Sequence, residues 1–392
     1  MIVILGLLLG LQPLATDMYL PSLPLIQQGF AAHVSQTQLT LTAFLLAFGC
    51  SQLVWGPLSD MLGRRPVLLI GLTGYVIGAV GCASAQSMDA LIAWRALQGA
   101  ALGAGVMCAR AVVRDLYAPH MGAQVMSKAL TGLGVLAFLA PVSGSLMVSW
   151  LGWRSTMLTQ ALMGCAAWLL VMLRFRESIP QRNPKALQPL NLLGTWARIM
   201  RNPMFLAYNL LTCFTYAGLF TNLAASSFTY INVLHMDRTH YGLMMGGNAL
   251  CYIAGTFACR RLLRSMSVQR AVAIAGFLTL ASGTAMGLAA LADVRSIWAY
   301  ALPFCFYQVA HGIHMPCGQS NAVAPFPQAA GTASALNGFV MMVMAFAMGH
   351  WLGLHLDADS TAPLALGVWF WSACTAFAAW VLVRRYGHMP QA

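Results

Sequence analysis

Charged residues are scarce in this chain of 392 residues, in which Asp, Glu, Lys and Arg together make up only 8%. A typical soluble domain carries about 25% charged residues, and so few charges cannot give a soluble protein its polar surface. Intrinsic disorder is also excluded, because it requires low hydrophobicity, whereas 59% of these residues are hydrophobic. The remaining class is a protein that crosses a membrane many times.

Several motifs of other protein classes are missing. The ten cysteines include no C-x-x-C pair. We interpret them as small buried hydrophobic residues, and we predict no metal site and no cofactor. The chain also lacks the G-x-S-x-G, H-E-x-x-H and P-loop motifs. A polytopic membrane enzyme is therefore a weak alternative, and an ion gradient is the expected energy source. The first residues, MIVILGLLLG, lack the basic region of a signal peptide, so we interpret them as the start of a first membrane span.

The most prominent feature of the sequence is a series of long apolar runs. A helix that spans a bilayer needs about 20 apolar residues. Dividing the chain at its charged and Pro/Gly-rich breaks predicts an all-α fold with twelve spans, at residues 2–27, 38–58, 66–85, 89–112, 127–149, 155–175, 204–228, 241–262, 268–290, 297–321, 329–352 and 363–384. The count would fall to eleven if residues 297–321 did not span.

A long polar stretch separates two halves of six predicted spans each. We predict an N-terminal bundle at 1–175, a cytoplasmic linker at 176–203 and a C-terminal bundle at 204–392. SKALTG at 127–132 resembles SALNG at 334–338, and W-L-G follows each of them. Two related halves are typical of transporters, although such small residues also coincide by chance in membrane helices.

The distribution of basic residues predicts the orientation, because Lys and Arg accumulate in cytoplasmic loops. With a cytoplasmic N-terminus, 17 of the 21 basic residues lie on the inner side, and only Arg154, Arg238 and Arg295 lie outside. Both termini are therefore predicted to be cytoplasmic. The net charge of +12 reflects this orientation, and no nucleic-acid partner is expected.

The stretch GPLSDMLGRRPVLL, at 56–69, lies between the second and third spans. An ordinary basic loop is one interpretation, but the spacing resembles the G-x-L-x-D-r-x-G-r-[RK] signature of the major facilitator superfamily. The resemblance implies two pseudo-symmetric six-helix bundles. It also implies that Asp60, Arg64 and Asp115 form a latch, which holds the cytoplasmic halves together when the binding site faces outward.

The corresponding stretch of the second half is GTFACRRLLR, at 255–264. It keeps the basic residues of the signature but has Cys259 where the acid would be. The latch is therefore expected mainly in the first half.

The first span carries an acid within LATDMYLPSLP, at 14–24. A charged residue inside a membrane is costly and by default functional, so Asp17 is a candidate proton carrier and substrate contact, together with Tyr19. Prolines on both sides interrupt the helix, which is tolerated where it lines a cavity. Alternatively, Asp17 is structural and bonds Arg95 or a backbone group.

The segment T-D-M-Y-L-P-x-L-P closely resembles the bicyclomycin-resistance (Bcr/CflA) branch of the drug–proton antiporters. Further segments at 38–60, 112–117, 216–231 and 330–336 resemble the same branch, and the likeness covers about residues 4–385. It implies a monomeric multi-pass protein of the bacterial inner membrane, which uses the proton gradient to export small amphipathic drugs or metabolites. An importer of a metabolite or sugar from the same superfamily is the alternative.

Two further stretches resemble antiporter motifs. Arg95 is followed by Gln98 and Gly99, and the resemblance links this arginine to proton transfer beside Asp17. Alternatively, Arg95 is a structural residue that extends to the outer interface. AFLAPVSGS, at 137–145, keeps Pro141 and Gly144 of the antiporter signature, although Ala and Ser replace two of its glycines.

The second half offers candidate substrate contacts. Tyr216 and Phe220 lie four residues apart, with Asn222 nearby, and aromatic side chains suit flat or cationic compounds. His311 and His314 share a helix face and are candidates for a proton relay or a substrate contact. For all of these residues, ordinary packing or hydrogen bonding is the alternative.

Overall fold

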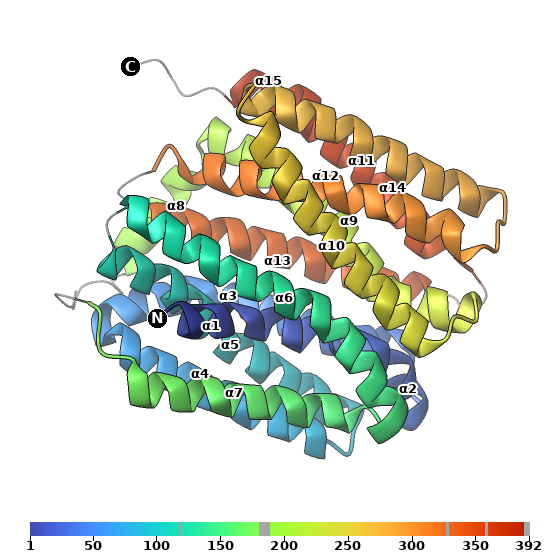
Figure 1. Cartoon of the computed structure of the whole chain (residues 1–392), viewed down its shortest axis with the longest axis horizontal. Helices are drawn as coiled ribbons and strands as arrows, with labels where there is room; N and C mark the ends of the chain where they lie inside the picture. Colours follow the sequence, from blue (N-terminus) through green and yellow to red (C-terminus); the bar gives the residue numbers. More distant parts are fainter. Residues whose placement is uncertain (118, 180–188, 327–328, 357–359, 388–392) are drawn as a thin grey trace. The chain divides into compact units, whose positions relative to one another are not determined.

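The computed structural model describes residues 1–117, 119–179, 189–326, 329–356 and 360–387 (Figure 1). The first half contains α1 (Ile2–Thr16), the 3₁₀ turn η1 (Leu20–Ser22), α2 (Leu23–Gly29), α3 (Val34–Leu62), α4 (Arg64–Ser84), α5 (Met88–Leu116), α6 (Pro119–Leu151) and α7 (Arg154–Arg174). After α8 (Pro189–Met200) come α9 (Pro203–Ser226), the π-helix η2 (Ser227–Val233), α10 (Arg238–Leu262), α11 (Val268–Leu291), α12 (Ile297–Val323), α13 (Ala330–His355), α14 (Ala362–Phe377), the π-helix η4 (Ala378–Leu382) and α15 (Val383–Tyr386).

These helices confirm the predicted all-α membrane protein. Among the described residues, 11 helical segments are long and apolar enough to cross a membrane. The predicted span at 297–321 corresponds to α12, which has the necessary length of 27 residues but carries several polar side chains, among them His311 and His314. The weakest of the twelve sequence predictions therefore falls on a helix that is long but less apolar than the others.

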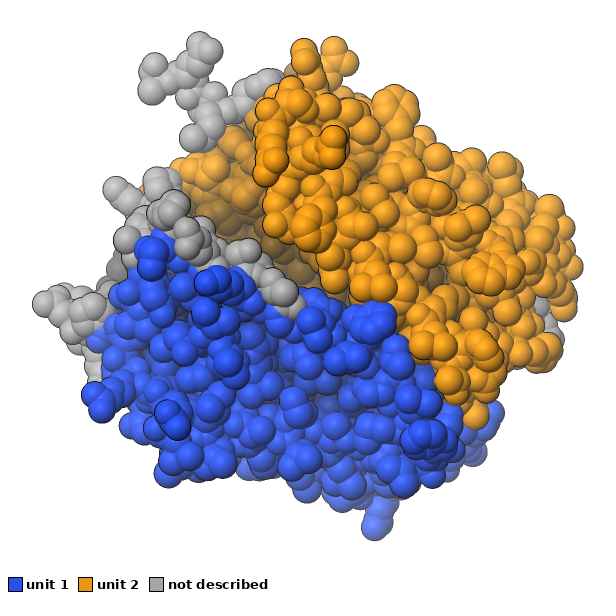
Figure 2. Space-filling view, viewed as in Figure 1, with its two compact units in different colours: residues 1–194 blue, residues 195–392 orange. Residues whose placement is uncertain are grey.

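The chain divides into two compact units, residues 1–194 and residues 195–392 (Figure 2). The division lies inside the predicted linker at 176–203, which also contains α8. Part of that linker, at 180–188, lies outside the described residues.

The two units repeat one packing scheme. In the first unit α3 packs on α5, α4 on α5 and α7, and α1 on α6. In the second unit α10 packs on α12, α11 on α12 and α14, and α9 on α13. Each pair of the first unit thus has a counterpart in the second. The echoed sequences at 127–132 and 334–338 lie on α6 and α13, which occupy corresponding places.

Polar side chains cap several helices at their first turn. Ser87 accepts a hydrogen bond from the backbone of Ala90 at the start of α5, and Asn202 accepts one from Phe205 at the start of α9. Within the first unit, glycines allow close helix contacts: a Cβ on Gly99 of α5 would lie 2.1 Å from the carbonyl oxygen of Phe44 on α3. This contact sets α3 and α5 close enough for side chains of α5 to reach the backbone of α3.

Candidate functional site

The first membrane-spanning segment is broken next to its acid. Helix α1 ends at Thr16, and Pro21 has no N–H to donate to the carbonyl of Asp17. The N–H of Tyr19 turns to the carbonyl of Thr16, at 3.2 Å, whereas a continuous α-helix would direct it to Ala15. The break therefore leaves the carbonyl of Ala15 available to a side chain from another helix.

Arg95 of α5 uses that carbonyl. Its guanidinium donates to the oxygen of Ala15 at 3.1 Å, to the backbone oxygen of Thr40 on α3 at 3.3 Å, and to Oε1 of Gln98 at 2.7 Å. The amide of Gln98 in turn donates to Oε1 of Gln160 on α7, at 2.9 Å. One buried polar network thus links α1, α3, α5 and α7.

Two aromatic rings hold the same guanidinium. Its central carbon lies 4.4 Å from the ring centre of Tyr19 and 4.2 Å from that of Phe44, distances typical of cation–π contacts. The hydroxyl of Tyr19 shares a hydrogen bond of 2.6 Å with the hydroxyl of Thr40. Arg95 is fully buried. The alternative of an arginine extending to the outer interface is therefore wrong, because every polar contact described for Arg95 lies inside the unit.

A direct contact between Asp17 and Arg95 was expected, and in this structure that expectation is wrong. Asp17 accepts a hydrogen bond from the hydroxyl of Thr16 at 2.8 Å, and no ion pair joins it to Arg95 among the described residues. The physical reason is the broken helix: the freed carbonyl of Ala15, at the negative end of the α1 dipole, takes a donor of Arg95 instead. Asp17 itself is partly exposed, although its neighbours on both sides are buried.

The antiporter-like stretch of α6 lies against this break. A Cβ on Gly144 would lie 2.4 Å from the carbonyl oxygen of Met18 and 2.9 Å from its Cα. Only a glycine therefore lets the backbone of α6 touch the chain next to Asp17 without a shift. Pro141 lies inside α6, one turn earlier. The structure thus brings Gly144 to the predicted proton carrier, a contact that the sequence pattern alone did not indicate.

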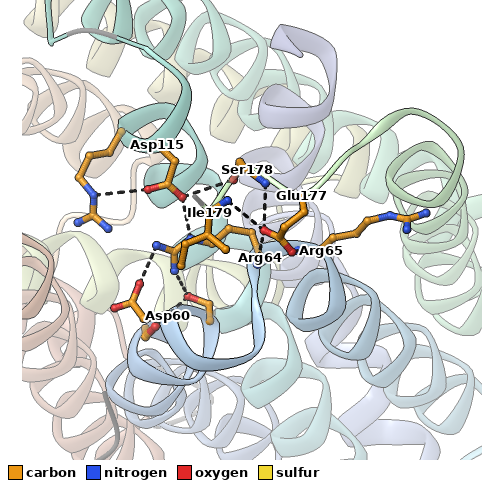
Figure 3. Close-up of polar contacts among 10 residues, drawn as sticks. Asp60, Arg64, Arg65, Asp115, Glu177, Ser178 and Ile179 are labelled. Carbon is orange, nitrogen blue, oxygen red and sulfur yellow. Dashed lines mark hydrogen bonds and ion pairs between the residues drawn. The ribbon is translucent and has the colours of Figure 1, made fainter. Parts of the chain in front are cut away.

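A second charged cluster joins the ends of three helices (Figure 3). Arg64, at the start of α4, forms ion pairs with Asp60 of α3 at 2.6 Å and with Asp115 of α5 at 2.9 Å. It also donates to the hydroxyl of Ser59. The side chain of Arg64 is only 2% exposed, whereas that of Asp60 is 42% exposed. The structure therefore brings together all three residues of the predicted latch.

Glu177 joins the same cluster, a contact that no sequence motif predicted (Figure 3). Its carboxylate accepts the backbone N–H groups of Arg64 at 2.9 Å and Arg65 at 3.1 Å, which are free at the start of α4. It also accepts those of Ser178 at 3.0 Å and Ile179 at 3.2 Å. A carboxylate at a helix N-terminus is favoured by the helix dipole. Glu177 therefore ties the segment after α7 to the start of α4.

Gly63 makes this contact possible. It has a φ of +105°, which favours glycine, and a Cβ at this position would lie 2.4 Å from Oε2 of Glu177. The hydroxyl of Ser178 also donates to Asp115, at 3.4 Å. Glu177 is the only glutamate in the sequence, and this single signal did not indicate a partner more than 100 residues away.

Glu177 gives a prediction for stability. Burial raises the pKa of the Glu177 carboxyl, but the four backbone donors lower it by more, so that it lies below its ordinary value of 4.5. A lowered folded-state pKa stabilises the fold above about pH 4.5, and this contribution disappears as the pH falls through the folded-state pKa. Glu177→Gln is expected to lower the melting temperature at pH 7 by roughly 2 °C, because the carboxylate is mostly exposed and screened. Thermal unfolding in detergent from pH 7 to pH 3 measures the difference.

The difference between Glu177→Gln and the wild type should shrink toward zero at the acidic end of this range. Asp293→Asn is the matched control, since Asp293 is an exposed acid with only a surface ion pair to Arg295. It should leave the melting temperature unchanged. A pH-independent difference for Glu177→Gln would contradict the proposed charge effect.

The candidate residues of the second unit lie on α9 and α12. Tyr216 is partly exposed, whereas Phe220 and Asn222 are buried. His311 is also buried, and its Nδ1 shares a hydrogen bond of 2.9 Å with the hydroxyl of Thr215. Of the two aromatic residues, only Tyr216 is accessible in this structure, and their role as substrate contacts stays a prediction.

The second histidine of α12 has a similar partner. Nε2 of His314 shares a hydrogen bond of 3.2 Å with the hydroxyl of Thr279 on α11. The ring of His311 also contacts that of Tyr252 on α10, with centroids 5.6 Å apart. Each imidazole thus has a hydroxyl partner on a different neighbouring helix, although Nδ1 of His314 is buried without a partner among the described residues.

Comparison with known sequences identifies the family. The sequence profile described as Major Facilitator Superfamily matches residues 5–349, which is most of the chain. The chain belongs to the Major Facilitator Superfamily. Members of this superfamily are membrane transporters of small molecules, and the buried network and the charged cluster of this transporter both lie in its first unit.

The relatives support the predicted branch of the superfamily. The chain is 28% identical to the Bicyclomycin resistance protein homolog of Haemophilus influenzae, over 93% of this chain and 91% of the relative. It is 28% identical to the Multidrug resistance protein D of Escherichia coli, over 86% and 84% of the two chains. The solved structure of a D-xylose–proton symporter matches with a TM-score of 0.75, covering 97% of this chain and 96% of that one. At 15% identity, this last likeness shows the shared fold alone.

Proposed function

We propose that this transporter exports small amphipathic drugs or metabolites in exchange for protons. The observation that supports the proposal most strongly is the contact between the antiporter-like stretch and the broken first span. Gly144 lies against the backbone of Met18, the residue next to Asp17. A shift of α6 during transport would therefore act directly on the chain that carries this acid.

Asp17 is the proposed proton carrier. Of the acids in the described membrane spans, Asp17 alone lies far from both ends of its span (Ile2–Gly29), whereas Asp60, Asp89 and Asp115 lie within three residues of an end of theirs. A carboxyl group inside a membrane is costly when charged, so taking up a proton has a large effect on its surroundings. Because Asp17 is partly exposed, a proton or a substrate can reach it. Proton uptake would weaken the binding of a cationic substrate at the same carboxylate.

Arg95 is proposed to keep the break next to Asp17 in place. It bonds the last turn of α1 while its charge is shared between carbonyl oxygens and two aromatic rings. Movement of Arg95 toward Asp17 would stabilise the carboxylate, and movement away would favour the protonated acid. In this way Arg95 would take part in proton coupling without forming a permanent ion pair.

The substrate contacts are proposed from accessibility. Asp17 and Tyr216 are partly exposed and are assigned direct contact with the substrate. Tyr19, Phe220, Asn222 and His311 are buried, so we propose that each has a supporting role within its own unit. The names of the relatives suggest amphipathic antibiotics as substrates, since one is called a bicyclomycin resistance protein homolog and another a multidrug resistance protein.

The cluster of Asp60, Arg64 and Asp115 is the proposed cytoplasmic latch. Its ion pairs fix the ends of α3, α4 and α5 to one another, so they can break and re-form together. We further propose that the protein works as a monomer in the bacterial inner membrane, with both termini in the cytoplasm.

The function can be tested in inverted membrane vesicles that are acidified inside by respiration. Bacteria that lack their own drug pumps supply the vesicles, with or without the wild-type transporter. A panel of bicyclomycin, chloramphenicol-type compounds, cationic dyes, cysteine and sugars is added to each. Antiport predicts that at least one compound accumulates inside and releases protons, and that a protonophore abolishes both signals. Vesicles without the transporter control for passive entry.

The same assay distinguishes antiport from import. Import predicts that a sugar or metabolite moves in the same direction as protons and that none of the drugs releases protons. If neither the drugs nor the metabolites of the panel dissipate the gradient, proton-coupled antiport of these compounds is excluded.

A further inference from the structure

Two thiols face each other across the contact between α10 and α12. The sulfur atoms of Cys259 and Cys317 lie 3.6 Å apart, and each side chain is 2% exposed. Cys259 occupies the position where the loop signature of the first half has an acid. The thiol of Cys259 also lies 4.0 Å from the carbonyl oxygen of Ile313, one turn before Cys317. The second unit therefore has a thiol pair near the position where the first unit has its ion pairs.

Glycines hold the two helices close at this level. A Cβ on Gly255 would lie 2.2 Å from the carbonyl oxygen of Val309, and a Cβ on Gly312 would lie 2.9 Å from the Cα of Gly255. When two helix backbones are this close, cysteines that face each other can bring their sulfur atoms within the distance of a disulfide bond. The close backbone packing therefore places the two thiols next to each other.

The chain next to Cys317 has some freedom to adjust. Pro316 lies inside α12 and lacks the N–H that would bond the carbonyl of Gly312. A disulfide requires the sulfur atoms to approach to about 2.05 Å, that is, by roughly 1.5 Å from their present separation. The proposed approach takes place by rotation of the two side chains, together with a small shift at this interrupted turn.

We propose that Cys259 and Cys317 form a redox modification site, at which oxidation by a peroxide joins α10 to α12 through a disulfide. The first thiolate attacks a peroxide oxygen, giving a sulfenic acid and, after protonation, one water. The second thiol displaces the sulfenic oxygen as a second water, and the sulfur–sulfur bond forms. Two thiols and one hydrogen peroxide thus yield one disulfide and two waters, with two electrons passing from sulfur to oxygen.

Access to the pair comes from the charged end of α10. Arg260 follows Cys259 directly, and both Arg260 and Arg261 are exposed. We place the entry of a small neutral oxidant at this end, because Cys259 lies only three residues before the last residue of α10, Leu262. In a reducing cytoplasm the pair would stay reduced until an oxidant accumulates. The disulfide would then restrain two helices that must otherwise be free to adjust against each other.

The experiment counts thiols in the purified full-length protein. The wild type is treated with hydrogen peroxide, and the remaining thiols are alkylated under denaturing conditions, with and without dithiothreitol. We expect two of the ten thiols to be lost and to be recovered by the reductant. Mass spectrometry of the digested protein should then identify one linked peptide that contains Cys259 and Cys317.

Cys259→Ser and Cys317→Ser should each abolish the linked peptide and the paired loss. Cys213→Ser is the matched control, because Cys213 is equally buried on α9 but its thiol bonds Asn209, at 3.6 Å. This variant should still lose two thiols. A linked peptide that joins other cysteines, or no reversible loss in the wild type, would overturn the proposal. The result is independent of transport, so it stands or falls separately from the proposed antiport.

Discussion

Asp17→Asn is expected to abolish proton-driven efflux while the protein is still produced and inserted. Asparagine has nearly the same shape as aspartate, and its carbonyl oxygen can still accept the hydrogen bond from Thr16. The asparagine amide does not take up or release a proton at any pH in the working range. Accumulation of drug in acidified inverted vesicles should therefore fall to the level of vesicles without the transporter, a loss of at least about 10-fold in the gradient-dependent rate.

Two variants make this prediction specific. Asp89→Asn makes the same chemical change at an exposed acid at the start of α5, and it should leave efflux unchanged. Asp17→Glu keeps a carboxyl group in the broken span and should retain part of the activity. Equal amounts of inserted protein are verified by a fluorescent fusion. Efflux at the wild-type rate in Asp17→Asn would remove Asp17 as the proton carrier.

The order of the helices and the latch were predictable because both follow from local patterns. Apolar runs of sufficient length predicted the spans, and the loop at 56–69 predicted that Asp60 and Arg64 lie together. Asp115 followed from its place at the end of the fourth span. The structure confirms these contacts, with Arg64 bonded to both acids. Their function as a latch remains a proposal.

The contacts that were missed depend on backbone geometry that the sequence does not display. Glu177 bonds free N–H groups at the start of α4, and such groups are present in every helix, so residue type did not single out this one. Arg95 bonds a carbonyl that is free only because the helix breaks at Thr16. Charge alone suggested an acid as its partner, and the expected pair with Asp17 was wrong for that reason.

In the second unit, sequence motifs and residue spacing did not predict which side chains lie together or which are buried. Cys259 was correctly noted as a departure from the signature, but its partner Cys317 lies 58 residues away on α12. Residue spacing indicated that Tyr216 and Phe220 share a helix face. It did not show how far neighbouring helices cover that face, and Phe220 is only 1% exposed.

Arg95→Ala is expected to destabilise the protein strongly. The substitution removes three hydrogen bonds and leaves acceptors on Ala15, Thr40 and Gln98 without their donor inside a buried region. The net loss is roughly 3 kcal/mol, because an unsatisfied buried acceptor costs about 1–3 kcal/mol and relief of the buried charge offsets part of the total. Thermal unfolding in detergent should show a melting temperature lower by roughly 5–10 °C.

Arg154→Ala provides a matched control for the chemistry. Arg154 also donates to two backbone carbonyls, those of Ala83 at 3.1 Å and Ala85 at 3.0 Å, and it contacts the ring of Trp153. Arg154 is exposed, so water can replace its hydrogen bonds, and the melting temperature should fall by no more than about 2 °C. Equal losses in the two variants would contradict the argument from burial.

Arg95→Lys separates the structural role of this residue from its proposed part in proton coupling. Lysine keeps the positive charge but lacks the planar fork that reaches three acceptors at once. We expect the variant to fold better than Arg95→Ala but to lose gradient-driven efflux, because its charge can no longer hold the last turn of α1 beside Asp17. Vesicle assays at matched protein levels measure the coupling. If Arg95→Lys keeps the wild-type coupling while Arg95→Ala loses stability, Arg95 is a structural residue, and Asp17 must exchange its proton without it.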